Sequence, residues 1–276
     1  MESPNLISPR DQLRSGGKGN TEMNVISLGW GVQSWTLAAM SALGELEPAI
    51  AIHSDTRRER EETYSFAARW AEWLEARGVR VITVTASNSA HRLYPESGSV
   101  FMPAFTNARR QRRRSYGGQL RRQCTSRWKI DPLIKAVRGI AGNDPVSMWL
   151  GISWDEMHRA KPARGAGMTN RWPLIEKRMT RSHCEEWLRR NGLEVPVKSA
   201  CWSCPLHSTA SWRSLSAGDR QKAIALDEQL RDARPNMKTF LSAKRVPLTQ
   251  VYAGIEAQAD MFEFENDSCE SGHCFV

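Results

Sequence analysis

The sequence of 276 residues has no long segment that is both uncharged and apolar. Its longest uncharged run, Met23–Gly44, is interrupted by polar residues such as Asn24, Gln33 and Thr36, which excludes a membrane-spanning helix there. Residues 1–22 are polar and contain no apolar core, so we expect no signal peptide. The expected protein is therefore cytoplasmic, without membrane association.

Acidic residues are the minority among the charged ones. Lys and Arg together number 39 against 30 Asp and Glu, which gives a formal net charge of +9. That excess favours an anionic partner such as a nucleotide or a nucleic acid. Hydrophobic residues make up 40% of the chain, an ordinary value for a globular protein, so a disordered or collagen-like chain is excluded.

Short apolar runs alternate with amphipathic stretches through the first half of the chain. We expect strands over 24–28, 49–53, 79–84 and 146–152, and helices over 33–43 and 59–77. This alternation predicts an α/β fold, doubly wound, with a mainly parallel sheet. Further helices are expected over 180–191, 209–215 and 219–233.

The strand signal fades after about residue 160, which favours a helical, cysteine-bearing subdomain at the C-terminal end. The expected organisation is a flexible tail over 1–22, a nucleotide-binding α/β domain over 23–165 and the helical subdomain over 166–276.

A glycine-containing segment, Ser27-Leu-Gly-Trp-Gly-Val-Gln-Ser34, lies between the first expected strand and the first expected helix. Glycines let backbone N–H groups approach a phosphate closely, and a helix N-terminus adds a partial positive charge. We expect Gly31 to need a backbone dihedral that side chains avoid. A plain strand-to-helix turn is the alternative. A Walker loop is excluded, because no Gly-Lys-Ser/Thr follows.

Six cysteines in a reducing compartment favour metal binding or catalysis over disulfides. The run Cys201-Trp-Ser-Cys204-Pro places two thiols at a spacing that binds one metal or cluster, or exchanges as a redox pair. Cys124, Cys269 and Cys274 supply enough further thiols for a four-thiolate site. Zinc accepts the same thiolates as an iron–sulfur cluster, so metal identity stays open.

The Ser27–Ser34 segment resembles the PP-loop of the adenine nucleotide alpha-hydrolase superfamily, whose usual form is Ser-Gly-Gly-x-Asp-Ser. It is most similar to the variant found in phage-type phosphoadenosine phosphosulfate (PAPS) reductase-like proteins. Gln33 replaces the family aspartate, and Trp30 falls on a family glycine. The further family motifs, in order, are His53-Ser-Asp-Thr56, Arg121-Arg-Gln-Cys-Thr-Ser-Arg-Trp-Lys-Ile130, Gly151-Ile-Ser-Trp-Asp-Glu-Met-His-Arg159, Asn170-Arg-Trp-Pro-Leu-Ile-Glu176 and Cys201-Trp-Ser-Cys-Pro-Leu-His207.

The resemblance implies roles for particular residues. The implied nucleotide-binding residues are Ser27, Gly29, Gly31, Gln33, Ser34, Asp55, Gly151 and Arg159. The implied catalytic residues are Cys124, Cys269, Cys274 and Asp155. The implied metal ligands are Cys124, Cys201, Cys204 and Cys274, holding a [4Fe–4S] cluster, with zinc as the alternative. A helix cap at Asp55, and exposed ion pairs for Asp155, Glu156 and Arg159, are the structural alternatives.

Three functions are consistent with these observations. The first is an ATP-using PP-loop enzyme with Mg²⁺ that releases pyrophosphate, adenylylates an acceptor oxygen and lets sulfur replace it on a nucleic acid or nucleotide. The second is a thiol-dependent reductase of PAPS or adenylylsulfate. The third is a non-catalytic nucleic-acid-binding module.

The partners differ among these functions. Arg109–Arg122 would contact a nucleic acid or form a solvated loop over a nucleotide. A sulfur donor or a thiol reductant protein would be a further partner of the two enzymes.

Overall fold

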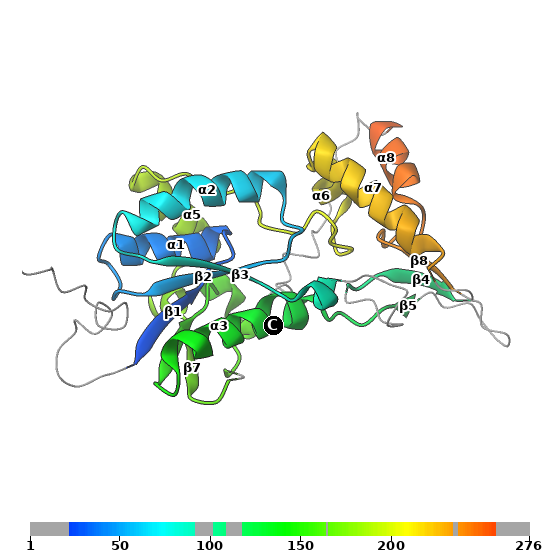
Figure 1. Cartoon of the computed structure of the whole chain (residues 1–276). Helices are drawn as coiled ribbons and strands as arrows, with labels where there is room; N and C mark the ends of the chain where they lie inside the picture. Colours follow the sequence, from blue (N-terminus) through cyan, green and yellow to red (C-terminus); the bar gives the residue numbers. More distant parts are fainter. Residues whose placement is uncertain (1–21, 92–101, 109–117, 164, 234–236, 258–276) are drawn as a thin grey trace, which may run out of the picture. The chain divides into compact units, whose positions relative to one another are not determined.

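The protein is described from a computed structural model that covers residues 22–91, 102–108, 118–163, 165–233 and 237–257. The chain forms two compact units (Figure 1). Unit 1 comprises residues 1–53, 68–83 and 133–195, and unit 2 comprises 54–67, 84–132 and 196–276. The units interleave along the chain, whereas the sequence analysis placed a single boundary after residue 165.

Unit 1 contains a five-stranded sheet with the order β3-β2-β1-β6-β7, of which β2 and β3 end in residues of unit 2. β1 pairs in parallel with both β2 and β6, and β6 pairs in parallel with β7. The predicted mainly parallel sheet is therefore confirmed. The strands are β1 (Met23–Ser27), β2 (Ile50–Asp55), β3 (Val81–Thr85), β6 (Val146–Trp149) and β7 (Met168–Arg171).

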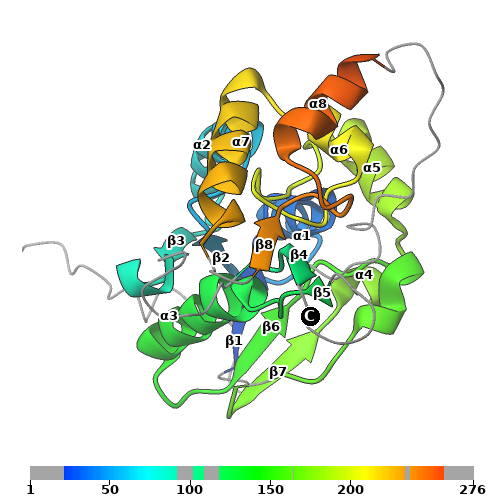
Figure 2. The ribbon, with the colours of Figure 1, turned by 90° about the vertical axis from the view of Figure 1, so that its right-hand side faces the viewer.

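Helices cover both faces of this sheet, as a doubly wound fold requires. α1 and α5 lie on one side and α3 on the other (Figures 1 and 2). α5 begins where predicted, because the Thr180 side chain accepts a hydrogen bond from the His183 backbone N–H and completes a capping box. The helices with residues in unit 1 are α1 (Val32–Ala42), α2 (Glu61–Glu75), α3 (Asp131–Ala141), the 3₁₀ helix η3 (Trp154–Arg159), α4 (Pro173–Glu176) and α5 (Arg181–Arg190).

Unit 2 has a second, antiparallel sheet of three strands in the order β5-β4-β8. Its strands are β4 (Phe105–Ala108), β5 (Gly118–Gln119) and β8 (Met237–Phe240). The other elements of unit 2 are the 3₁₀ helix η1 (Asn88–His91), the π-helix η2 (Thr125–Ile130), α6 (Thr209–Arg213), α7 (Ala217–Arg231) and α8 (Leu248–Ala257).

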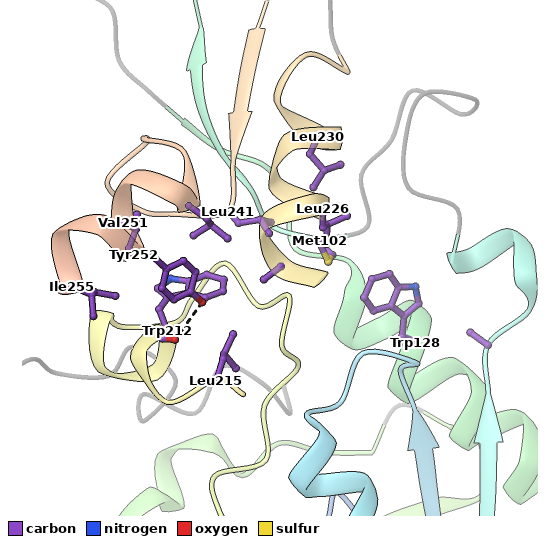
Figure 3. Packing of buried hydrophobic residues seen from close by; sticks show 13 residues of the cluster. Met102, Trp128, Trp212, Leu215, Leu226, Leu230, Leu241, Val251, Tyr252 and Ile255 are labelled. Atoms are coloured by element: carbon purple, nitrogen blue, oxygen red, sulfur yellow. Dashed lines mark hydrogen bonds between the residues drawn. The ribbon is translucent and has the colours of Figure 1, made fainter. Parts of the chain in front are cut away.

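The core of unit 2 forms where α6, α7 and α8 pack together, around Trp212, Leu226 and Tyr252 (Figure 3). The Tyr252 hydroxyl donates to the Trp212 carbonyl oxygen, 3.3 Å away. A fully buried carboxylate, Asp227, accepts backbone N–H groups from Leu241 and Leu248 at 2.8 and 3.1 Å. This one α7 side chain therefore holds two distant chain segments in place.

The region after residue 165 contains two strands beside its helices, and the sequence did not predict them. β7 adds a fifth strand to the main sheet, and β8 pairs with β4. The described ends of the expected arginine loop are strands too, since Asn107–Ala108 belongs to β4 and Gly118–Gln119 is β5. No helix in the described part of the chain has the length and apolar character needed to cross a bilayer.

Candidate functional site

The phosphate-loop candidate, Ser27–Ser34, connects β1 to α1 within unit 1. From β1 the chain continues to β2 and β3 on one side, and β6 and β7 are added on the other side. The loop therefore follows the carboxyl end of the strand at the switch point, where open α/β sheets bind their ligands. α1 has no acidic residue in its first turn, so the partial positive charge of the helix N-terminus is not offset there.

The Ser34 hydroxyl closes the loop on itself. Its Oγ accepts a hydrogen bond from the Gly29 backbone N–H at 3.0 Å and donates to the Gly31 carbonyl oxygen at 3.3 Å. A serine in the first helical turn thus determines how the two glycines are held. Ser27 is half-buried at the end of β1, directly before this turn.

Trp30, rather than Gly31, adopts the strained backbone conformation of the loop. Gly31 has φ −90°, which any residue can adopt, whereas Trp30 has φ +54°. The expectation for Gly31 was therefore wrong. Trp30 is 2% exposed and packs against Trp35 and His53, with ring centroids 6.1 and 6.4 Å apart. This packing holds a bulky residue in a region that costs about 1–3 kcal/mol.

Gly151 follows β6 and lies against the loop. A Cβ atom built on Gly151 would be 2.6 Å from the Ser34 backbone nitrogen, closer than side chains approach backbone. Only glycine fits, so the β6 end and the phosphate loop are packed backbone to backbone. This brings Gly151 to the loop that contains Gly29, Gly31 and Ser34; their role in nucleotide binding stays a prediction.

Gln33 and Arg159 meet at one carboxylate. The Gln33 amide donates to Glu156 Oε2 at 3.3 Å, and Arg159 Nη1 donates to the same oxygen at 2.6 Å. Arg159 is 8% exposed, and its Nε has no hydrogen-bond partner among the described residues. A buried guanidinium with an unused N–H is suited to an additional anionic ligand.

The two predicted aspartates are engaged in local structure. Asp155 is exposed, and its Oδ1 accepts the Arg181 backbone N–H at 3.2 Å, at the start of α5. Asp55, in unit 2, accepts from the Arg57 backbone N–H and from the Tyr64 hydroxyl, both at 2.7 Å. Burial, together with the Asp55 carboxylate, raises the pKa of Tyr64, so this hydroxyl stays protonated and donating. The catalytic role of Asp155 stays a prediction.

A cavity of about 40 Å³ in unit 2 gathers three of the predicted cysteines, Cys124, Cys201 and Cys204. Cys204 is held by its backbone N–H, which donates to the Cys201 carbonyl oxygen at 3.0 Å. The remaining lining residues are Thr56, Met102, Pro103, Arg122, Thr125, Trp128, Lys129, Ser199, Ala200, Ser203, Pro205 and Leu206.

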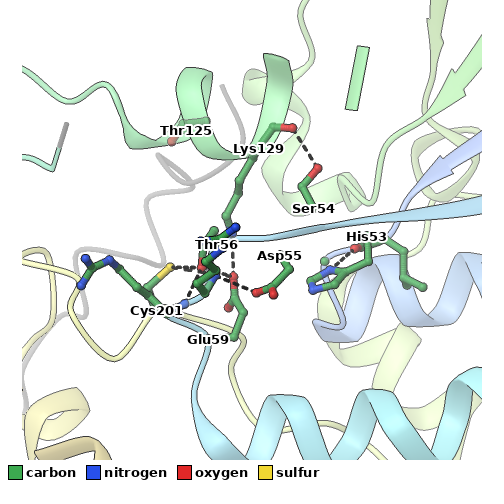
Figure 4. A network of polar contacts seen from close by, with 12 residues as sticks. His53, Ser54, Asp55, Thr56, Glu59, Thr125, Lys129 and Cys201 are labelled. Carbon is green, nitrogen blue, oxygen red and sulfur yellow. Dashed lines mark hydrogen bonds and ion pairs between the residues drawn. The ribbon is translucent and has the colours of Figure 1, made fainter. Parts of the chain in front are cut away.

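A polar network adjoins the cavity, and the side chains of Thr56, Glu59, Lys129 and Cys201 turn toward one another in it (Figure 4). Glu59 is 2% exposed; its Oε1 accepts from Thr56 Oγ1 at 3.0 Å, lies 3.5 Å from Lys129 Nζ and 3.8 Å from Cys201 Sγ. Thr56 Oγ1 is also 3.3 Å from Cys201 Sγ. Backbone bridging between Glu59 and Cys201 keeps the two side chains adjacent.

The electrostatics of the cavity keep its central thiol protonated. Burial raises the pKa of Cys201, and the negative charge of Glu59 raises it further, while Lys129 partly opposes both effects. Proximity of Cys124 raises the same pKa slightly. A thiol in such surroundings needs an added positive charge or a base before it can act as a nucleophile or a ligand.

A metal site is not complete within the part of the chain that the structure describes. No three His, Cys, Asp or Glu side chains are grouped there in a way that could hold a metal ion. The four described cysteines are free thiols, and the fourth of them, Cys184, is buried in α5 of unit 1. Cys269 and Cys274 lie outside the described residues, so the four-cysteine cluster stays a prediction.

Two residues that contact the cavity lining, Glu59 and Arg58, were not identified from the sequence. Glu59 carries no motif signal, because a carboxylate at the start of a predicted helix is ordinary. Arg58 was also missed: its guanidinium lies between the Trp128 and Trp202 rings, 5.4 and 5.3 Å from their centroids. Arg122 donates twice to Thr125 Oγ1 on the cavity wall, at 3.0 and 2.7 Å. The arginines from 109 to 114 lie outside the described residues.

The parallel sheet and the glycine loop at its switch point are features of doubly wound nucleotide-binding folds. No family model and no curated protein matches the chain. Two enzymes are among the solved structures to which the chain is similar. One is the phosphoadenylyl-sulfate (PAPS) reductase of Candida auris in a phosphate complex, with 11% identity and a TM-score of 0.41, over 66% of this chain and 83% of that chain. The other is the U34-tRNA thiolase NcsA of Methanococcus maripaludis with its [4Fe-4S] cluster, with 12% identity and a TM-score of 0.40, over 92% of this chain and 80% of that chain.

Proposed function

We propose that this protein is an ATP-using PP-loop enzyme that activates an oxygen of a nucleic acid or nucleotide for replacement by sulfur. The observation that carries the proposal is the backbone-to-backbone packing of Gly151 against Ser34. It supports a loop whose N–H groups are preorganised at the N-terminus of α1, where phosphate oxygens are favoured. The buried Arg159 guanidinium, with its unused Nε, supports the same ligand.

The reaction balances with inorganic sulfide as the sulfur source. The acceptor oxygen attacks the α-phosphorus of ATP, a phosphorus–oxygen bond breaks, and pyrophosphate leaves. Hydrosulfide then attacks the activated carbon, the carbon–oxygen bond breaks, and AMP leaves with the oxygen. No electron transfer is needed. The loop and Arg159 would offset the charge that develops on the phosphates.

The thiol cavity of unit 2 supports the sulfur part of the proposal. Cys124, Cys201 and Cys204 line one cavity, which supports sulfur chemistry at that place. A [4Fe–4S] cluster, with zinc as the alternative, is proposed for these cysteines with Cys274 or Cys269 as fourth ligand. The described residues alone do not make a metal site. We therefore assign no reaction step to the cluster.

Product analysis with labelled substrates tests the function. We expect α-labelled ATP, incubated with bulk RNA and sulfide, to yield AMP and pyrophosphate and to leave sulfur in the RNA. Sulfite formed from PAPS would instead support the thiol-dependent reductase. Nucleic-acid binding without turnover of either nucleotide would support the binding module, and both results would contradict the proposal.

Two glycine variants sharpen this test. Gly31→Val introduces a side chain at a φ that valine can adopt, so lost ATP binding would report blocked phosphate approach rather than backbone strain. Gly139→Ala is the matched control, because a Cβ there meets nothing within 4 Å. Unchanged ATP binding by a folded Gly31→Val protein, measured by titration calorimetry, would remove the phosphate-loop assignment.

Anaerobic purification with iron and zinc analysis tests the metal. We expect stoichiometric iron with visible absorbance that Cys201→Ser removes and Cys184→Ser leaves intact. Cys184 is a suitable control because it is buried in α5 and is not among the residues that line the cavity. Stoichiometric zinc, or a metal-free protein, would contradict the iron–sulfur assignment.

A further inference from the structure

One exposed aromatic side chain beside the phosphate loop has no role in the function proposed so far. Trp154 is 40% exposed, and Met157, three residues further along η3, is 50% exposed. They are among the five large hydrophobic side chains that the described surface leaves exposed, and the only two of those five within a few residues of each other. Indole is costly to leave in water, so such a pair indicates a ligand surface.

The η3 helix that carries Trp154 is firmly attached to unit 1. The Trp154 backbone N–H donates to the Met179 carbonyl oxygen at 2.8 Å. The next residue, Asp155, accepts the Arg181 N–H at 3.2 Å. The Glu156 carboxylate accepts hydrogen bonds from Arg159 and from Gln33 of the phosphate loop. Trp154 is therefore exposed on a preorganised surface, not at a loose chain end.

One guanidinium lies near this indole, and further cations are exposed in the same stretch of sequence. The Arg178 guanidinium lies 5.9 Å from the Trp154 ring centroid, and Arg178 itself is exposed. Lys161 and Lys177 are exposed as well. The nearby carboxylates are engaged, Asp155 by a backbone N–H and Glu156 by Arg159. Among the described residues from 154 to 181, Lys and Arg outnumber Asp and Glu by six to three.

We propose that Trp154 and Arg178 form a base-stacking platform for single-stranded RNA or DNA, on which the acceptor strand rests; the proposal rests on the sulfur-transfer function above. An exposed indole stacks any base, and the adjacent guanidinium contributes both stacking and a phosphate contact. The contact from residue 156 to Gln33 connects this platform to the loop. A protein partner would also use Trp and Met, but the surplus of cations favours a polyanion.

Fluorescence anisotropy with a fluorescein-labelled 12-nucleotide oligouridine tests the platform. Loss of one stacked base is worth about 1–3 kcal/mol, so Trp154→Ala should weaken binding by about 5- to 140-fold. Its salt dependence should stay that of the wild type, because no charge is removed. Trp154→Phe should restore most of the affinity. Arg178→Ala should lower the slope of log affinity against log salt by about 0.7.

Matched controls exclude general effects. The Arg77 guanidinium lies 4.0 Å from the centroid of the Trp73 ring, so a second tryptophan–arginine pair is available as a control. Trp73 is in α2 and Arg77 follows that helix. Arg77→Ala should leave oligouridine binding unchanged. Leu43 is exposed to a similar extent as Trp154, and Leu43→Ala should likewise change nothing. Equal weakening by Leu43→Ala and Trp154→Ala would overturn the proposal.

The two proposals fail in different ways. Oligouridine binding that Trp154→Ala leaves unchanged, or no binding by the wild type, overturns the platform. Self-association that Trp154→Ala abolishes, with oligouridine binding unchanged, would assign the patch to a protein contact. ATP-dependent AMP formation is measured separately, with the wild-type protein. If no AMP forms while oligouridine binding is intact and depends on Trp154, the sulfur-transfer function alone is overturned.

Discussion

The phosphate loop of unit 1 and the thiol cavity of unit 2 are built in opposite ways. The loop is one contiguous run, Ser27–Ser34, closed by hydrogen bonds within itself and packed closely against Gly151. The cavity takes its lining from four separate stretches, Thr56, 102–103, 122–129 and 199–206. A contiguous site depends on local backbone geometry, whereas a dispersed one depends on every segment being held in register.

The two sites also differ in what holds them. Unit 1 relies on a missing side chain, since only glycine at 151 allows the loop to pack. Unit 2 relies on buried carboxylates, Glu59 beside the cavity and Asp227 in the core, which accept hydrogen bonds from distant segments. Buried charge is costly unless it is paired, so unit 2 should be more sensitive to side-chain removal.

The largest expected effect is in unit 2. Asp227→Ala leaves the backbone N–H groups of Leu241 and Leu248 buried without an acceptor. At about 1–3 kcal/mol for each buried donor, the free energy of unfolding should fall by about 4 kcal/mol. Urea unfolding measures this. Asp232→Ala is the control, because that exposed carboxylate pairs with exposed Lys238, and the change should alter stability by less than about 0.5 kcal/mol.

The corresponding change in unit 1 should be smaller in stability and larger in ligand binding. Gly151→Ala places a methyl group against the Ser34 backbone, and overpacking of this kind costs about 1–3 kcal/mol. Because the loop must shift, ATP binding should be lost in a protein that still folds. Urea unfolding and titration calorimetry give both values. Wild-type ATP affinity in this variant would show that the close approach is irrelevant to the ligand.

The pH dependence of stability reports on Cys184, the buried thiol of unit 1. Burial raises the pKa of Cys184 to about 12, against an ordinary value near 9. The folded state then holds the proton that the unfolded state releases, so stability falls as pH rises above 9. Between pH 8 and pH 10 the wild type should lose about 1.4 kcal/mol more than Cys184→Ala. Parallel stability curves for the two proteins would contradict the raised pKa.

The smallest expected effect is a gain in stability. Gly139 lies within α3, and a Cβ there meets nothing within 4 Å. Gly139→Ala should therefore stabilise the protein by about 0.5–1 kcal/mol through helix propensity. Thermal unfolding would show the shift. A loss of stability would mean that the space around a glycine does not predict the effect of adding a methyl group. The contrast between Gly139 and Gly151 would then no longer hold.

The sequence by itself determined the elements whose signals are local. β1, α1, β2 and β6 follow runs of buried apolar residues, and α5 begins at its capping threonine. The glycine loop was identified because turn chemistry depends on neighbouring residues. The gathering of Cys201 and Cys204 in one cavity followed from their spacing of three, which brings two thiols together where the chain turns, as it does here.

Only the tertiary structure decided the features that depend on distant pairing. β7 has a mostly polar sequence, Met-Thr-Asn-Arg, and is a strand because β6 offers it a free edge. β4 and β8 pair across more than 130 residues, and no local pattern carries that register. Glu59 lies beside the cavity because the segment of Cys201 bridges to it. Trp30 takes the strained conformation because Trp35 and His53 hold its ring. Packing contacts between distant residues outweigh local preference, which is why a sequence reveals a loop more readily than a cavity.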